Sequence, residues 1–351
     1  MPDGGPHKIE LPRLIVVGGG IIEGIGKELS TLGVRSVGVL TSKTPFGLLG
    51  DRLEQSLKTS GIGYRLFLDD GKPHESVRDE FLETIGMEVD GLVGVGGGRV
   101  LDISKLIAEK SGKEFFSVPT IPSHDGIASP LVSILTGNTR TSRFAKTPQA
   151  VFADISVLVN SPHQYIASGF GDVIGKYTAV KDWRLAHLLL GEYYGEYTAD
   201  LALECAEIMM KRAEEVGEGS AEGVRALVEA LVNCGILISI AGTSRPCSGS
   251  EHLFSHALDQ IRHTSSFHGQ QVGIGTIMMS YLHGADWEKV RNSLAEARAP
   301  TSAKELGVSD EVIVEALVRA ASVRPDRYTI LGEKGLSKKA AIDLARSTRV
   351  I

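Results

Sequence analysis

The sequence predicts an α/β protein, with a Rossmann-like parallel sheet in an N-terminal domain and an all-helical C-terminal domain. Three observations predict it. Short β-branched runs alternate with amphipathic stretches in the first half, long helical stretches follow one another in the second half, and Asn160-Ser161-Pro162 separates the two. A chain of 351 residues is long enough for two domains, which we expect at residues 1–160 and 161–351.

In the first half, β-branched and apolar runs predict strands at residues 14–17, 36–40, 64–68, 91–95 and 115–118. Apolar residues at helical spacing predict helices at residues 23–32, 48–60, 76–86 and 102–111. A strand that alternates with a helix is typical of a parallel sheet. After the apolar run at 150–159, we expect a bundle with helices at residues 172–190, 197–216 and 223–239.

Composition excludes several classes of protein. Hydrophobic residues make up 42% and charged residues 23%, the balance of a folded globular protein. The net charge of −6 gives no global positive field for nucleic acid or anionic membrane. Three cysteines without a CxxC pair favour a reducing compartment. No signal-peptide core and no apolar run approaching about 18 residues is evident, so we expect a cytoplasmic protein without membrane insertion.

Two glycine clusters, Gly18-Gly19-Gly20 and Gly94-Val95-Gly96-Gly97-Gly98, each lie between a predicted strand and a predicted helix. Glycine lets a ligand approach the backbone, and a helix N-terminus attracts phosphate. Neither cluster completes GxGxxG, so each is either a tight turn or a phosphate site. We expect Asp102 and Lys105, which follow, to form an exposed ion pair. Thr41-Ser42-Lys43-Thr44 lacks the acidic residue typical of NAD specificity, which favours acceptance of NADPH.

Five of the ten histidines fall between residues 252 and 283. Ser248 and Glu251 have capping-box spacing, which predicts a helix there and places His252 and His256 on one face. His268 opens an apolar segment at residues 273–281. We expect Asp172 in the first turn of a helix. The pattern leaves two alternatives: a metal site, or histidines that are hydrogen-bonded structural residues. HExxH is absent, which disfavours a metallopeptidase.

Several motifs together resemble the archaeal sn-glycerol-1-phosphate dehydrogenase family, whose fold is shared with glycerol dehydrogenase, iron-containing alcohol dehydrogenases and dehydroquinate synthase. The likeness spans nearly the whole chain. The matching stretches include Gly96-Gly97-Gly98-Arg99-Val100-Leu101-Asp102, Pro119-Thr120-Ile121-Pro122-Ser123-His124-Asp125-Gly126-Ile127-Ala128-Ser129-Pro130, Gly171-Asp172, Ser250-Glu251-His252-Leu253-Phe254-Ser255-His256-Ala257-Leu258-Asp259, His268-Gly269 and Gly275-Thr276-Ile277-Met278-Met279.

The resemblance implies roles for residues at matching positions. It implies one Zn²⁺ per subunit, held by Asp172, His252 and His268, and substrate contacts from Asp125, Asp172 and His256. With His256, the three metal ligands make up the implied catalytic set. It also implies contacts to NADPH or NADH from Gly97, Gly98, Arg99, Val100, Leu101, Thr120, Ile121, Pro122, Ser123 and Ser129.

The implied reaction is the metal-dependent reduction of dihydroxyacetone phosphate to sn-glycerol 1-phosphate, the backbone of archaeal ether phospholipids. Water or a relay through His256 and Asp125 would supply the proton. Relatives with this fold associate, so we expect at least a homodimer. The alternatives are a glycerol dehydrogenase acting on unphosphorylated glycerol or dihydroxyacetone, a lyase of the dehydroquinate synthase type, and a nucleotide-binding regulatory protein whose histidines only pack.

Overall fold

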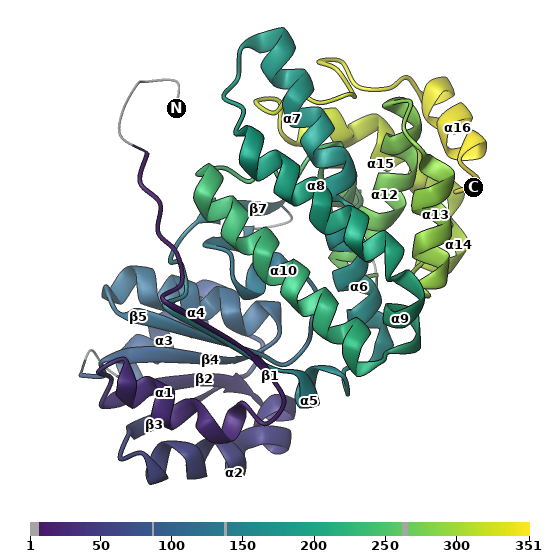
Figure 1. Ribbon diagram of the computed structural model, residues 1–351. Helices are drawn as coiled ribbons and strands as arrows, with labels where there is room; N and C mark the ends of the chain where they lie inside the picture. Colours follow the sequence, from purple (N-terminus) through teal and green to yellow (C-terminus); the bar gives the residue numbers. More distant parts are fainter. Residues whose placement is uncertain (1–6, 86–87, 137–138, 262–265) are drawn as a thin grey trace.

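The computed structural model describes residues 7–85, 88–136, 139–261 and 266–351. Its first half is built on a six-stranded sheet, parallel throughout, in the order β1-β8-β5-β4-β2-β3 (Figure 1). The strands are β1 (Leu14–Gly18), β2 (Ser36–Ser42), β3 (Gly63–Asp69), β4 (Gly91–Gly96), β5 (Glu114–Pro119) and β8 (Ala150–Asp154). The five predicted strands are confirmed to within two residues at either end, and β8 is a sixth strand inside the apolar run at 150–159.

Helices cover both faces of the sheet because its strands are apolar on both faces. The first four are α1 (Ile25–Thr31), α2 (Lys43–Thr59), α3 (His74–Ile85) and α4 (Gly98–Ser111). One core holds side chains of α1 and α2 with Val37 and Val39 of β2. The other holds side chains of α3 and α4 with Leu40 and continues without a break into the helical half.

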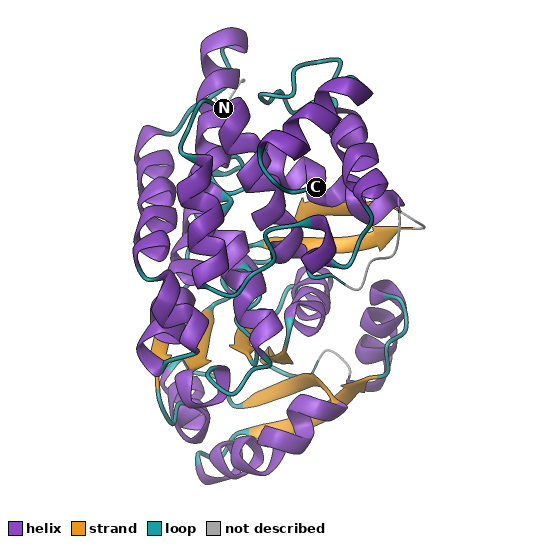
Figure 2. Cartoon of the chain, turned by 90° about the vertical axis from the view of Figure 1, so that its right-hand side faces the viewer, coloured by secondary structure: helices purple, strands orange, loops and turns teal. Residues whose placement is uncertain are grey.

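The second half consists of helices, as predicted (Figure 2). They are α5 (Ile155–Leu158), α6 (His163–Ile174), α7 (Lys176–Leu190), α8 (Glu196–Lys211), α9 (Ala213–Glu218), α10 (Ala221–Ala241), α11 (Ser250–Ile261), α12 (His268–Leu282), α13 (Trp287–Glu296), α14 (Ala303–Leu306), α15 (Asp310–Val323) and α16 (Lys338–Ser347). The sheet ends at Asp154 and α6 begins at His163, on either side of residue 160. The division into domains there stays a prediction.

A two-stranded antiparallel hairpin, β6 (Leu131–Thr136) and β7 (Thr139–Phe144), lies apart from the main sheet and is missing from the sequence prediction (Figure 2). Its first strand packs on α4, where Val132 and Ile134 join Leu106 in a small apolar cluster. The hairpin therefore extends one wall of the N-terminal half towards the helices.

Helix α10 is the one helix in the described part of the chain that is long and apolar enough to cross a membrane, with a mean hydropathy of 1.8 over its best window. The expectation that no stretch approaches such a span is therefore wrong by length and composition. However, 67% of that window is buried inside the protein, and α10 packs against α6, α8 and α9. A core helix needs this composition for the same reason as a membrane helix: it has apolar surroundings on most sides.

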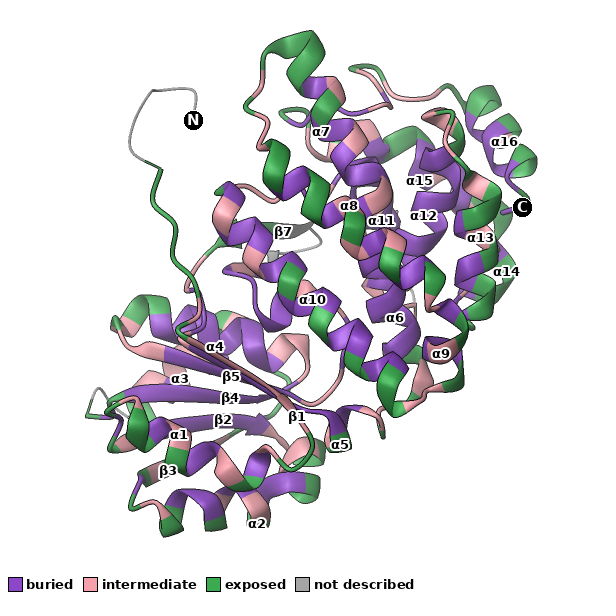
Figure 3. Ribbon diagram, viewed as in Figure 1, coloured by how far each residue is buried: buried purple, intermediate pink, exposed green. Residues whose placement is uncertain are grey.

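Helices α6 and α12, both largely buried in Figure 3, cross at the distance of backbone contact. A Cβ on Gly171 of α6 would lie 2.1 Å from the carbonyl oxygen of Gly269, and a Cβ on Gly269 would lie 1.8 Å from that of Ser168. Glycine is thus the residue that permits this crossing. The Ser168 hydroxyl also accepts a hydrogen bond from the Gly269 N–H at 3.2 Å.

We predict that Gly269→Ala lowers the free energy of unfolding by about 1–3 kcal/mol, because α12 must move away from α6. Denaturant unfolding of the purified chain measures this cost. Gly47→Ala is the matched control. Gly47 is an exposed residue of α2 with nothing within 4 Å of its added Cβ, so alanine should stabilise by about 0.5–1 kcal/mol. If Gly269→Ala and the wild type had equal free energies of unfolding, the close crossing of α6 and α12 would be contradicted.

Candidate active site

A cavity of about 810 Å³ opens between the carboxyl edge of the sheet and the helical half. The sheet side contributes Gly98 at the start of α4 and the segment after β5. The helical side contributes α6, α11 and α12. The predicted site residues that line it are Gly98, Arg99, Asp125, Ser129, Asp172, His252, His256 and His268. The carboxyl edge of a parallel sheet is the usual place for a ligand in such folds.

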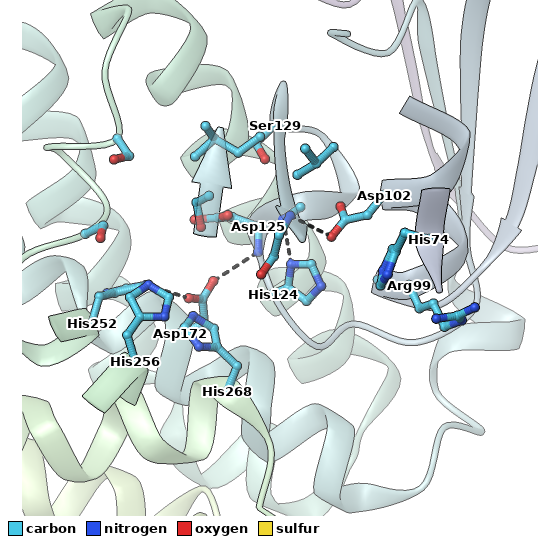
Figure 4. Close-up of a pocket in the computed structure, with 18 of the residues that line it drawn as sticks. His74, Arg99, Asp102, His124, Asp125, Ser129, Asp172, His252, His256 and His268 are labelled. Atoms are coloured by element: carbon cyan, nitrogen blue, oxygen red, sulfur yellow. Dashed lines mark hydrogen bonds and ion pairs between the residues drawn. The ribbon is translucent and has the colours of Figure 1, made fainter. Parts of the chain in front are cut away.

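Asp172, His252 and His268 converge in this cavity (Figure 4). Each offers a ligand atom, and these atoms lie within 4.8 Å of one another. His252 is in the first turn of α11 and His268 is the first residue of α12. Asp172 was predicted in the first turn of a helix, but it lies in the last turn of α6, because the chain forms a separate helix before Gly175. Its carboxylate therefore points to the histidines rather than stabilising a helix start.

Hydrogen bonds orient both imidazoles. His252 Nδ1 lies 2.7 Å from Glu251 Oε1, and His252 Nε2 lies 3.5 Å from Asp172 Oδ1. His268 Nδ1 lies 3.0 Å from the hydroxyl of Ser255, which itself donates to Gln271 and so accepts from the ring. In this arrangement the Nδ1 atoms carry the hydrogens and the Nε2 lone pairs remain available, as in metal-ligating histidines.

The capping box predicted from Ser248 and Glu251 does not form. The buried Glu251 carboxylate instead accepts hydrogen bonds from the Thr178 hydroxyl at 2.7 Å and the Gly249 N–H at 2.6 Å, and contacts His252. Asp182 of α7 takes the place of the cap, since it accepts from the N–H and the hydroxyl of Ser250. Glu251 thus serves to orient a histidine, which sequence spacing did not reveal.

A buried cation balances the carboxylates at this site. The ammonium of Lys176, fully buried, lies 3.0 Å from Asp125 Oδ2 and 3.2 Å from Asp172 Oδ2. The Asp125 N–H donates to the same Asp172 oxygen at 3.0 Å. Asp172 Oδ2 is thus engaged within the protein, and Oδ1 faces the histidines. Lys176 was not predicted from the sequence; its position four residues after Asp172 on a helical stretch is the signal for it.

These contacts and the burial of the site set the protonation states of Asp172, His252 and His268. Burial alone would raise the pKa of the Asp172 carboxyl, but the Lys176 charge and the His252 hydrogen bond lower it well below its usual range. Burial and the neighbouring His252 lower the pKa of His268, which is therefore neutral near pH 7. Burial also opposes the charge on His252, yet its hydrogen bonds to Asp172 and Glu251 raise its pKa above 6.5.

His256 lies one turn after His252 on α11, and both line the cavity, as their spacing predicts. The His256 ring stacks on His268 with centroids 5.8 Å apart. It is not part of the three-residue group that could hold a metal. The structure thus brings His256 and Asp125 beside that group rather than into it.

The glycine turn after β4 lies directly against the segment after β5. A Cβ on Gly98 would lie 2.1 Å from His124 Nε2, and one on Gly97 would lie 2.7 Å from Ile121 Cδ1. Helix α4 begins at Gly98, four residues before the predicted start, and no side chain caps it. Its first N–H groups therefore face the edge where a phosphate could bind. The remaining predicted cofactor contacts flank this turn without lining the cavity: Gly97, Val100, Leu101, Thr120, Ile121, Pro122 and Ser123.

The glycine turn after β1 is filled by the protein itself. The backbone N–H groups of Gly20 and Ile22 donate to the buried carboxylate of Asp154 at 3.2 and 3.1 Å. Asp154 stands at the end of the neighbouring strand β8. Of the two alternatives for this cluster, the structure therefore favours the tight turn over the phosphate site.

The charged residues after the second glycine cluster are also engaged. Asp102 and Lys105 form the expected ion pair, with 3.5 Å between Asp102 Oδ1 and Lys105 Nζ, but both are buried rather than exposed, because strand β6 packs on α4. Lys105 donates to the carbonyls of Gly126 and Leu131. The Arg99 guanidinium makes two hydrogen bonds to Asp69, at 2.6 and 2.8 Å. The guanidinium is thus engaged within the protein, and a cofactor contact of Arg99 stays a prediction.

The sequence of the chain is similar to those of known dehydrogenases. The family model for iron-containing alcohol dehydrogenases matches residues 16–162. The chain is 47% identical over 347 residues to a glycerol-1-phosphate dehydrogenase (NAD(P)+) of Aeropyrum pernix, covering 98% of this chain and 99% of the relative. It is 45% identical over 347 residues to the enzyme of that name from Methanothermobacter thermautotrophicus, covering 99% of each.

Solved structures with the same fold include a glycerol dehydrogenase from Schizosaccharomyces pombe, with a TM-score of 0.83 at 20% identity, covering 98% of this chain and 91% of that one. A maleylacetate reductase from Rhizobium matches with a TM-score of 0.75 at 18% identity, covering 98% of each chain. At these identities the likeness concerns the fold alone. The identity to the full-length relatives is decisive: the chain belongs to the glycerol-1-phosphate dehydrogenase family.

Proposed function

We propose that the protein reduces dihydroxyacetone phosphate to sn-glycerol 1-phosphate with NADPH or NADH, for the glycerol backbone of ether phospholipids. The observation that supports this most directly is the convergence of Asp172, His252 and His268 in one cavity with the glycine turn, in a chain 47% identical to a glycerol-1-phosphate dehydrogenase. That relative is named an NAD(P)+ enzyme, which supports NAD(P)+ as the cofactor here.

The donor set fits a catalytic divalent cation. One carboxylate and two imidazoles leave coordination positions open for substrate, and we assign them to one Zn²⁺ per subunit. Glu251 and Ser255 support that assignment because they fix the rings through Nδ1. When both groups are bound, the cation polarises the ketone oxygen and the nicotinamide supplies the hydride.

The remaining side chains of the cavity position the substrate and handle the proton. Asp125 has one carboxylate oxygen held by Lys176, so its other oxygen can accept a hydrogen bond from a substrate hydroxyl. His256 stands beside His268 and can donate to the substrate. These two residues can carry the proton that the product alcohol requires. The segments 97–101 and 120–123, together with Ser129, are assigned to the cofactor.

We also propose that the protein works in the cytoplasm as a homodimer or larger homo-oligomer, without nucleic acid or an inserted membrane segment. Lys43 and Thr44 are exposed in the first turn of α2, directly after β2, whose Thr41 pairs with Val95 just before the glycine turn. A cation and a hydroxyl suit a 2′-phosphate, which supports acceptance of NADPH.

The decisive experiment is elemental analysis of protein purified without chelator, followed by a spectrophotometric assay with each cofactor. We expect one zinc per chain and oxidation of NADPH or NADH that depends on dihydroxyacetone phosphate. A preference for dihydroxyacetone or glycerol over the phosphorylated forms would instead identify a glycerol dehydrogenase.

We predict that His252→Ala loses bound zinc and activity together while the far-ultraviolet circular dichroism is kept. Glu251→Gln should weaken zinc binding by about 10–100-fold, because the amide oxygen that replaces the carboxylate is an uncharged and weaker acceptor for His252 Nδ1–H. His256→Ala is the matched control from the same face of α11. It should retain zinc and raise the KM for dihydroxyacetone phosphate. A fully active His252→Ala protein without metal would refute the ligand assignment.

Zinc affinity should fall as the pH is lowered. The pKa of His252 is raised in the metal-free protein, so below that pKa a proton must leave before the ring can bind a cation. One displaced proton weakens the apparent affinity about tenfold per pH unit below this pKa, and the affinity levels off above it. Titration against a chelator of known proton affinity between pH 5.5 and 8.5 measures the slope. A flat profile across this range would show that His252 is not a ligand.

A further inference from the structure

A buried arginine lies behind one wall of the cavity. Arg327, in the segment between α15 and α16, is 8% exposed. Its Nη1 donates to the carbonyl oxygen of Ser248 at 2.6 Å and its Nη2 to the hydroxyl of Ser244 at 2.7 Å. Both serines line the cavity that holds Asp172 and the histidines. The guanidinium thus contacts the back of the wall whose front faces the substrate.

Arg327 has no carboxylate within ion-pair distance in the part of the chain that the structure describes. Its neighbours are already paired: Arg245 with Glu192, Nε to Oε1 at 2.7 Å, and Arg324 with Asp326 at 3.1 Å. Burial lowers the pKa of Arg327 to about 9, and the charges of Arg324 and Arg245 add to this effect. The group is still charged at neutral pH. A buried charge without a counter-ion is costly, so an anion in the cavity would stabilise it.

The hydrogen bond from Arg327 also determines what Ser244 can do. A guanidinium only donates, so the Ser244 oxygen must accept, and its own hydrogen is directed elsewhere. Ser244 and Ser248 are both partly exposed to the cavity. The wall therefore presents hydroxyl donors in front of a buried positive charge, which is a suitable arrangement for a phosphate.

The two serines and the histidine group share one cavity. Ser248 lies in the turn before α11, four residues before His252, and Ser244, Ser248 and His252 all line the cavity. A small molecule bound at the histidines can therefore extend towards the two serines. The other cations at this cavity have partners: Arg99 is paired with Asp69, and Lys72 with Asp70 and Glu80.

We propose that Ser244 and Ser248, supported from behind by Arg327, form the subsite for the phosphate group of the substrate. The proposal rests on the proposed function and adds the residues that favour a phosphorylated ketone over an unphosphorylated one. Ser244 and Ser248 contact the phosphate, and Arg327 is a positioning residue that fixes the Ser244 hydroxyl and supplies the charge.

The test uses the zinc-loaded full chain and the variants Arg327→Met, Arg327→Lys and Ser244→Ala. Arg324→Gln is the matched control, because it removes the same charge three residues away from an exposed ion pair. Two quantities are measured: kcat/KM for dihydroxyacetone phosphate relative to dihydroxyacetone, and the Ki of inorganic phosphate as a competitor of the phosphorylated substrate.

Arg327→Met should lower the preference for the phosphorylated ketone by about 10–100-fold and raise the phosphate Ki in parallel, the scale of a lost charge-assisted hydrogen bond. Ser244→Ala should lower the preference and raise the phosphate Ki, each about three- to tenfold. Arg327→Lys should restore part of what Arg327→Met loses. Arg324→Gln should remain within twofold of the wild type. A merely structural Arg327 would instead reduce activity on both ketones equally and leave the phosphate Ki unchanged, which would overturn the proposal.

If Arg327→Met does not fold, the test uses Ser244→Ala and Arg327→Lys alone. If both variants kept the wild-type preference for dihydroxyacetone phosphate and the wild-type phosphate Ki, the subsite would be overturned. Failure of the proposed function has a different signature. The wild type would then not reduce dihydroxyacetone phosphate at all. In that case the thermal shift produced by inorganic phosphate, present in the wild type and lost in Ser244→Ala, still supports the subsite, and equal shifts in both overturn it.

Discussion

The backbone contact between α6 and α12 is the constraint on which the site depends. Gly171 and Gly269 let the two helices approach until Asp172 and His268, the adjacent residues, share one space. Helix α6 also lies against the loop after β5, because a Cβ on Gly169 would lie 1.9 Å from the carbonyl oxygen of Pro122. Three glycines on two helices thus couple the histidine group to the loop after β5, where the dinucleotide is proposed to bind. A change in that crossing would move both halves of the site together.

Charge is distributed unevenly around the cavity. At one end, the carboxylates of Asp172 and Asp125 share the single ammonium of Lys176, which leaves a negative excess suited to a divalent cation. At the other end, Arg327 is buried without a carboxylate partner among the described residues, which leaves a positive excess suited to an anion. A substrate with a ketone at one end and a phosphate at the other matches this order. The separation of charge orients such a molecule before any reaction occurs.

The sequence predicted the sheet well because buried parallel strands are continuous apolar runs bounded by turns. Hairpin β6–β7 was not predicted, although the apolar run at 131–136 is followed by Gly137 and Asn138, which is a turn signal. Asp172 was misplaced because Gly175 has helical angles, so no sequence signal separates α6 from α7. The partners Glu251–Thr178 and Arg327–Ser244 lie 73 and 83 residues apart, and only the folded chain brings them together.

The two glycine turns show why local pattern cannot assign a phosphate site. Both follow a strand, both precede a helix, and both expose backbone N–H groups at the carboxyl edge of the sheet. After β1, the neighbouring strand β8 ends in Asp154, whose carboxylate already accepts from Gly20 and Ile22. After β4, the adjacent strand β5 ends in Pro119, and the loop that follows brings the aliphatic side chain of Ile121 and the imidazole of His124 against the glycines. In this chain, the residues at and after the end of the adjacent strand therefore decide whether a glycine turn is filled by the protein's own carboxylate or is left without one.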